Sequence, residues 1–172
     1  MVLRETWLLC ALSAVMALGC GKTSANSSPA KTSAPAASAP AEGCSQHAVC
    51  GNHFFLDILS PGHCPAGMEC TISIKLGATD GFHVNDEYPY KFKADLTDGV
   101  QFVGTDPAGQ NVFSKPAGNW HKVDEKSGLL AVKFFVGTPG QATITGTFKL
   151  SVCSAENCLL EQRDLRTEVI AL

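Results

Sequence analysis

The chain has 172 residues, a formal net charge of −3 and eight cysteines. This length is enough for one ordinary folded domain. The near-balanced charge argues against a nucleic-acid partner, because proteins that bind nucleic acids usually carry a basic excess.

The N-terminal segment predicts an export signal over residues 1–19. An apolar run of twelve residues extends from Trp7 to Leu18 and follows Arg4. A membrane-spanning helix needs about 20 apolar residues, whereas a run of this length is typical of a secretion signal. We therefore expect an exported protein whose mature chain lacks this segment.

The apolar run stops at Cys20, and the residues before it, Ala17-Leu18-Gly19, resemble a bacterial lipobox. The resemblance implies cleavage before Cys20 and acylation of its sulfur, which would anchor the protein stably in a membrane. Gly21 at the next position resembles the enteric sorting signal for the outer membrane, which implies a protein of the bacterial cell envelope that faces the periplasm. The alternative is ordinary signal cleavage nearby, which leaves Cys20 as a spare thiol.

Residues 20–43 are predicted to form a tether. After Cys20 the segment is rich in Ala, Ser, Pro and Thr and has no large apolar residue. Such a composition buries too little apolar surface to offset the loss of chain entropy on folding. We expect it to hold a folded domain, residues 44–172, away from a membrane surface.

Apolar residues alternate with other residues along much of 44–172, which predicts β-strands. The alternating positions are Phe54, Leu56, Ile58, Ile72, Ile74, Leu76, Phe92, Ala94, Leu96, Val100, Phe102, Leu130, Val132, Phe134, Val136, Ala142, Ile144, Phe148, Leu150, Val152, Leu165 and Val169. Turn signals such as Thr79-Asp80-Gly81 separate these runs. The pattern predicts an all-β, immunoglobulin-like antiparallel sandwich of about seven or more strands.

Two polar segments interrupt the strands. The first has His83 followed by Asn85-Asp86-Glu87-Tyr88, a set that could do acid–base chemistry. We interpret it instead as a strand-entry turn in which Tyr88 and Tyr90 pack on a sheet edge. The second, residues 106–128, is predicted to be a long irregular loop, and loops of this length are usually functional or disordered.

The six cysteines of the predicted domain are expected to form disulfides, because an even number in an exported domain is typical of them. Their short spacings favour structural pairs between Cys44 and Cys50 and between Cys64 and Cys70. Cys153 and Cys158 have four residues between them. From their spacing alone, this last pair is either a permanent staple across a hairpin or a dithiol that exchanges electrons.

The N-terminal cysteines also invite a metal interpretation. His47 and His53 alternate with Cys44 and Cys50 in CSQHAVCGNH, and these residue types are ligands for zinc or copper. An oxidising compartment favours disulfides over thiolate ligands, and the spacing differs from that of a standard zinc finger. We therefore predict no metal and no cofactor, with surface histidines beside structural disulfides.

Two stretches, GFHVNDEYPYKFKAD at 81–95 and QATITGTFKLSVCSAENCLLEQRDLRTEV at 141–169, carry a family resemblance together with the strand pattern between them. Residues 53–172 resemble the N-terminal periplasmic domain of DsbD, a thiol–disulfide reductant conductor, and its free-standing relatives. The resemblance implies an immunoglobulin-like fold in which Cys153 and Cys158 are catalytic and cycle between dithiol and disulfide. Members of that family cover their cysteine pair with a loop, and residues 106–128 are the segment expected to do so here.

The sequence thus favours an envelope lipoprotein that exchanges disulfides through Cys153 and Cys158. The expected partners are exported thiol–disulfide proteins or another envelope protein, and the membrane through the lipid anchor. The alternative is a non-enzymatic lipoprotein whose sandwich binds another envelope protein and whose disulfides are all structural.

Overall fold

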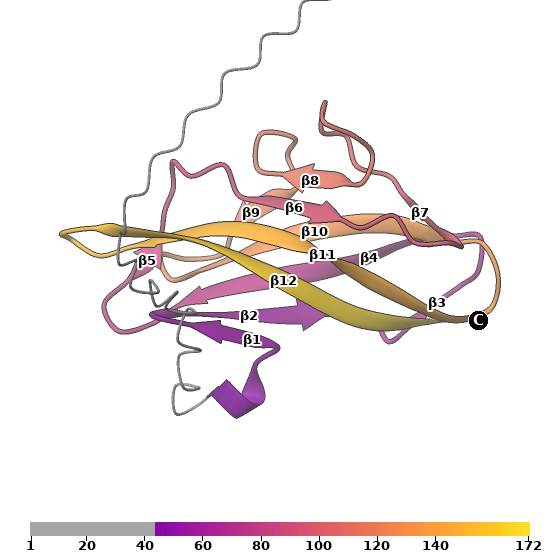
Figure 1. Ribbon diagram of the computed structural model, residues 1–172, viewed down its shortest axis with the longest axis horizontal. Helices are drawn as coiled ribbons and strands as arrows, with labels where there is room; N and C mark the ends of the chain where they lie inside the picture. The colour runs from indigo at the N-terminus through magenta and orange to yellow at the C-terminus, as the bar shows by residue number, and fades with distance from the viewer. Residues whose placement is uncertain (1–43) are drawn as a thin grey trace, which may run out of the picture. The chain divides into compact units, whose positions relative to one another are not determined.

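The structure is a computed structural model, and it describes residues 44–172. A short 3₁₀ turn, η1 (Cys44–Gln46), precedes twelve strands (Figure 1). Within these residues, no helix is long and apolar enough to cross a membrane. The strands form two six-stranded sheets.

The first sheet has the strand order β1-β2-β4-β10-β7, and β9 also pairs with β10. Its longest pairing joins β4 and β10, which run antiparallel. Glu69 lies opposite Phe135 at one end of this pairing, and Gly77 lies opposite Ser127 at the other. The strands are β1 (Val49–Gly51), β2 (Phe54–Leu59), β4 (Glu69–Ala78), β7 (Val100–Phe102), β9 (Trp120–Lys122) and β10 (Ser127–Val136).

The second sheet has the order β3-β12-β11-β6-β8, and β5 also pairs with β11. Its centre is the long hairpin of β11 and β12, whose end projects at the left of Figure 1, away from the C-terminus. The strands are β3 (His63–Cys64), β5 (His83–Val84), β6 (Lys91–Ala94), β8 (Val112–Ser114), β11 (Gly140–Cys153) and β12 (Cys158–Ala171).

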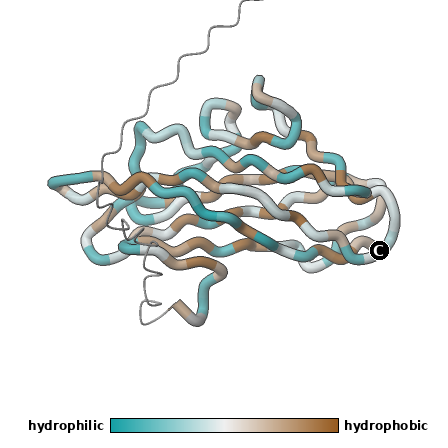
Figure 2. The backbone as a smooth tube through the Cα atoms, viewed as in Figure 1, coloured by the Kyte–Doolittle hydropathy of each residue, from teal (hydrophilic) through white to brown (hydrophobic). Residues whose placement is uncertain are grey.

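The core lies between the two sheets and is built from the alternating positions of the sequence. In β10, for example, Leu130, Val132 and Phe134 are each 0% exposed. Apolar side chains at every second position point to one face of a strand, so a sheet buries them together. The apolar segments in Figure 2 follow these strands. The predicted all-β sandwich of mainly antiparallel strands is confirmed.

Two local expectations are corrected. Leu96, predicted to continue the face of Phe92 and Ala94, is 83% exposed because β6 ends at Ala94. The segment 106–128 is less irregular than predicted, since it contains β8 and β9 and the start of β10. Phe113 in β8 is fully buried, which explains an aromatic residue in a polar stretch.

Candidate functional site

The six cysteines of residues 44–172 form three disulfides: Cys44–Cys50, Cys64–Cys70 and Cys153–Cys158. The two pairings predicted from the spacing of the N-terminal cysteines are confirmed. Cys20, the predicted acylated residue, lies outside the described residues.

The three disulfides differ in their exposure. Cys64 and Cys70 are both buried and belong to the core. Cys44 and Cys50 are half-buried. In the third pair, Cys153 is 6% exposed while Cys158 is open to solvent. This is the asymmetry that exchange chemistry needs, because one sulfur must be reachable.

The Cys153–Cys158 pair closes the end of the β11–β12 hairpin. The backbone N–H of Ser154 donates to the carbonyl of Asn157 at 2.8 Å, which makes these two residues the last hydrogen-bonded pair. Hydrogen-bonded and non-hydrogen-bonded pairs alternate along an antiparallel ladder. Cys153 and Cys158 are therefore a non-hydrogen-bonded pair, with Cα atoms 4.0 Å apart, so their side chains lie on one face.

That face is the outer face of the second sheet. In β11, Phe148, Leu150 and Val152 point into the core, so Ser151 and Cys153 point outward. Both are nevertheless buried, and the alternation of burial along β11 stops over its last four residues. Another part of the chain must cover the outer face here.

Asn85, which follows β5, contributes to this cover. Its side-chain Nδ2 lies 4.0 Å from the Cys158 sulfur and donates to the Ser151 hydroxyl at 3.4 Å. The Ser151 hydroxyl in turn lies 4.0 Å from the Cys153 sulfur. A polar hydrogen therefore lies within reach of each sulfur, where it could stabilise a thiolate if the disulfide opened.

The position of Asn85 is set by β5, in which His83 pairs directly with Cys153. Cross-strand partners share a face, so the exposed imidazole of His83 lies on the same side of the sheet as the disulfide. The Asn85 side-chain oxygen accepts the N–H of Glu87 at 2.9 Å and starts a tight turn. The predicted strand-entry turn is thus present, and it also contacts the sulfur.

Tyr90 fixes the other end of this turn. Its hydroxyl donates to the Ser151 carbonyl at 2.8 Å, and its ring stacks on Trp120 with centroids 3.9 Å apart. Burial raises the pKa of the Tyr90 hydroxyl, which therefore stays a hydrogen-bond donor. Tyr90 is fully buried, so the expectation that it packs on a sheet edge is wrong.

Two lysines of the segment 106–128 hold this turn through Asp86. Lys122 of β9 pairs with the Asp86 carboxylate at 2.6 Å, and Lys115 donates to the Asp86 carbonyl. The hydrogen bond from Lys122 is the main cause that lowers the pKa of Asp86. The hydrogen bond to the Cys158 sulfur comes from Asn85, and 106–128 contributes to this site through its contacts with Asp86.

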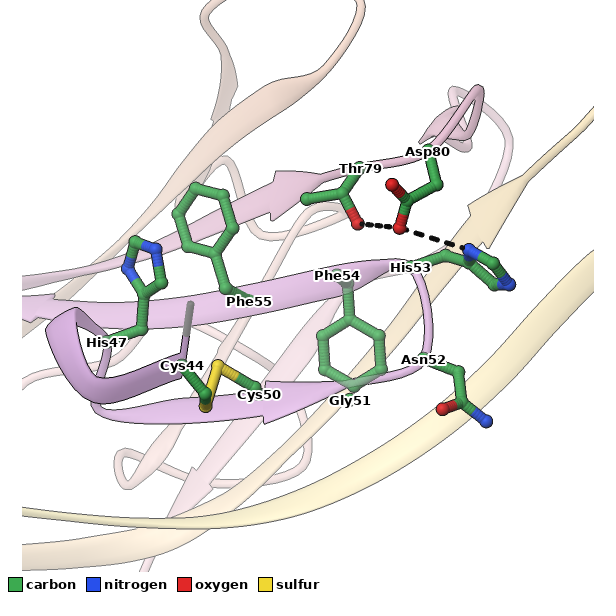
Figure 3. Close-up of a pocket in the computed structure, with 10 residues that line it drawn as sticks. All are labelled: Cys44, His47, Cys50, Gly51, Asn52, His53, Phe54, Phe55, Thr79 and Asp80. Carbon is green, nitrogen blue, oxygen red and sulfur yellow. Dashed lines mark hydrogen bonds and ion pairs between the residues drawn. A yellow bond between two sulfur atoms is a disulfide. The ribbon is translucent and has the colours of Figure 1, made fainter. Parts of the chain in front are cut away.

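The N-terminal histidines lie in a different region, a surface pocket of about 380 Å³ beside the Cys44–Cys50 disulfide (Figure 3). His47 stacks on Phe55 and its Nδ1 lies 2.9 Å from the Asp57 carboxylate. His53 stacks on Phe82. Within residues 44–172, no three His, Cys, Asp or Glu side chains are grouped to hold a metal ion.

No protein-family model matches the chain, and no curated protein matches it either. Among solved structures, AggA, the major subunit of aggregative adherence fimbriae type I from Escherichia coli, aligns with 73% of this chain and 100% of its own, at 11% identity and a TM-score of 0.35. The ASH/PapD-like domain of human CEP192 aligns with 68% of this chain and 84% of its own, at 8% identity and a TM-score of 0.29. Similarity at this level carries no argument about function.

Proposed function

We propose that this chain is an exported lipoprotein of the bacterial envelope that exchanges disulfides with other exported thiol proteins through Cys153 and Cys158. The observation that carries the proposal is the asymmetry of this pair, with one sulfur exposed and the other buried. The resemblance of residues 81–95 and 141–169 to the N-terminal domain of DsbD points to the same two cysteines.

The hairpin offers little structural need for this disulfide. Residues Gly140–Cys153 pair with Cys158–Ala171 along the whole length of both strands. Their register is thus held by a long hydrogen-bonded ladder, and closing a loop this short removes little entropy from the unfolded chain. The Cys64–Cys70 disulfide differs because its sulfurs are part of the packed core.

The exchange is balanced in electrons and protons. A partner thiolate attacks the Cys158 sulfur, the Cys153–Cys158 bond breaks, and Cys153 leaves as a thiolate. A second thiolate of the partner then attacks the sulfur of the partner's first cysteine in the mixed disulfide, and Cys158 leaves as a thiolate. The partner loses two electrons and two protons, and this chain gains them as the Cys153 and Cys158 thiols. The reverse sequence reduces a partner disulfide.

Single cysteine variants test the proposal in cells. In Cys153→Ser, the exposed Cys158 attacks a partner disulfide, and this chain no longer has the second thiol that would resolve the product, so a discrete mixed disulfide should accumulate. Cys158→Ser leaves only a buried thiol and should trap much less. The matched control adds Leu96→Cys to the Cys153→Ser/Cys158→Ser double variant, because position 96 is exposed and lies outside the β11–β12 hairpin.

Non-reducing gels with mass spectrometry read out the trapped species. The proposal requires that Cys153→Ser trap a defined partner protein that the Leu96→Cys control does not trap. If neither single variant traps more than the control, the pair is a hairpin staple. The chain is then better described as a non-enzymatic binding lipoprotein.

Anchoring at Cys20 is the second half of the proposal, and a fractionation experiment tests it. Cys20→Ala should move the protein from the membrane fraction to the soluble fraction, because the acyl chains are lost. Intact mass measurement of the wild-type protein should show the acyl groups. A variant that still sediments with membranes, together with an unmodified wild-type mass, would contradict the lipoprotein assignment.

A further inference from the structure

Strand β12 forms a long open edge of the second sheet. One hydrogen-bonding edge of β12 pairs with β11 over its whole length. On the opposite edge, β3 pairs with β12 only at Ile170 and Ala171. Within residues 44–172, no strand pairs with this opposite edge between Cys158 and Glu168. An uncovered edge presents unpaired backbone N–H and C=O groups to other chains.

The backbone groups on this edge belong to the even-numbered residues. Because Ser154 and Asn157 form the last hydrogen-bonded pair of the hairpin, alternate residues of β12 direct their N–H and C=O away from β11. Leu160 and Gln162 are the first of these after Cys158. The Gln162 carbonyl accepts from the Arg163 guanidinium at 2.9 Å, an exposed contact that an incoming strand can replace.

We propose that the edge from Cys158 to Gln162 binds an extended, cysteine-bearing segment of the partner as an added antiparallel strand. This inference rests on the proposed function and names the form in which the partner is recognised. Backbone hydrogen bonds supply the affinity in such strand addition, and side chains at alternate positions supply the specificity.

The direction of sulfur attack favours this edge. Exchange at a disulfide sulfur proceeds in line, with the nucleophile opposite the leaving sulfur. Cys153 is the leaving group and lies on the β11 side of Cys158. The nucleophile must therefore arrive from the open side of β12. A residue paired directly with Cys158 on an added strand would have its Cβ about 5 Å from that of Cys158.

The side chains along β12 limit the docking region to its first residues. Leu160 is 69% exposed and shares the outer face with Cys158. Further along that face the side chains are charged, at Asp164, Arg166 and Glu168. Figure 2 shows the same change, from apolar near the hairpin end to hydrophilic along the middle of β12. Charged side chains on an edge discourage strand pairing.

The preferred partner segment therefore has an apolar residue two positions before its cysteine. In an antiparallel pair, a cysteine opposite Cys158 places the residue two positions earlier opposite Leu160. Those two side chains then lie on one face and make an apolar contact.

A short extended peptide tests the proposal on the full chain. The probe is a reduced peptide with a leucine two positions before its cysteine, and its twin carries N-methyl groups on the amides that would face β12. The native peptide should open the Cys153–Cys158 disulfide, forming a mixed disulfide with Cys158 and releasing the Cys153 thiolate. This reaction should be at least about tenfold faster than that of the N-methylated twin, which lacks two backbone hydrogen bonds. Dithiothreitol is the control, because this small thiol attacks the disulfide without forming backbone hydrogen bonds to β12.

A variant pair tests the same edge from the side of the protein. Gln162→Pro removes an outward N–H at an edge position where proline is tolerated, and Gln162→Ala changes the side chain alone. Gln162→Pro should slow the peptide reaction about as much as N-methylation does, and Gln162→Ala should not. Both variants should react with dithiothreitol like the wild type, which also reports that the hairpin is intact.

A serine analogue of the peptide separates this proposal from the proposed function. If the analogue protects the amides of Leu160 and Gln162 from hydrogen exchange, the edge binds strands even if the disulfide never exchanges. Equal rates for the native and N-methylated peptides, or no amide protection, would overturn strand addition. Exchange with dithiothreitol in that case would leave the proposed function standing.

Discussion

Asn85 is the residue that brings a polar hydrogen to the exposed sulfur of the Cys153–Cys158 pair. Its side-chain amide donates to the Ser151 hydroxyl and accepts the backbone N–H of Glu87. A donor at this position favours the thiolate of Cys158 over the neutral thiol, because hydrogen bonds to charged acceptors are stronger than those to neutral ones.

Removing this donor should slow the chemistry of Cys158. In the Cys153→Ser background, Asn85→Ala should lower the rate of Cys158 alkylation by iodoacetamide at neutral pH by roughly fivefold, the effect of losing about one hydrogen bond. Asn52→Ala, at an exposed asparagine in the turn after β1, is the matched control. An unchanged rate in Asn85→Ala would remove Asn85 from the site.

The sequence alone predicted the two cysteines but not Asn85. Cys153 and Cys158 are close in sequence and end two alternating runs, so a hairpin brings them together. Asn85 is 73 residues from Cys158, and it reaches the sulfur only because β5 pairs with the end of β11. A strand of two residues has no periodicity from which that pairing could be inferred.

The turn between β5 and β6 depends on neighbouring elements for its position. Lys122 of β9 holds the Asp86 carboxylate, and Lys115 after β8 holds its carbonyl. The short strands β8 and β9 form because Phe113 enters the core and Trp120 stacks on Tyr90. These contacts are tertiary, which is why residues 106–128 look irregular in the sequence.

The Asp86–Lys122 pair predicts a small acid-dependent contribution to stability. The hydrogen bond from Lys122 lowers the pKa of Asp86 below its usual 3.8 in the folded protein. Its stabilising effect is therefore complete above the usual pKa and is lost as the pH falls through the lowered one. Asp86→Asn should flatten the decline in stability between about pH 5 and pH 2, as measured by urea unfolding.

The control for this experiment is Asp98→Asn, at an exposed position in the turn before β7. The expected change is small, because the Asp86–Lys122 pair is largely exposed to solvent. A pH profile of Asp86→Asn identical to that of the wild type and of Asp98→Asn would show that Lys122 does not hold the turn.

At the scale of the whole molecule, the alternating pattern was sufficient to predict the sandwich. Long strands such as β10 and β11 have clean two-residue periods, and two such sheets must bury their apolar faces against each other. The order of strands within each sheet could not be predicted, because alternation specifies a buried face and not a neighbour. The open edge of β12 follows from that order, so it too was beyond the sequence.

The distribution of disulfides is also a property of the whole molecule. One pair lies in the core, one beside the N-terminal pocket, and one at the free end of the longest hairpin. We assign exchange to the last pair alone. The other two are assigned a structural role, so the three pairs should differ in how readily they are reduced.

The most direct test is a redox titration of the full-length protein against glutathione buffers, with each disulfide followed separately by alkylation and peptide mass spectrometry. We predict that Cys153–Cys158 has a reduction potential above about −300 mV, the region of labile and catalytic disulfides, and that Cys64–Cys70 has one below it. If Cys153–Cys158, like Cys64–Cys70, is still oxidised in buffers poised below about −300 mV, thiol–disulfide exchange by this pair is contradicted.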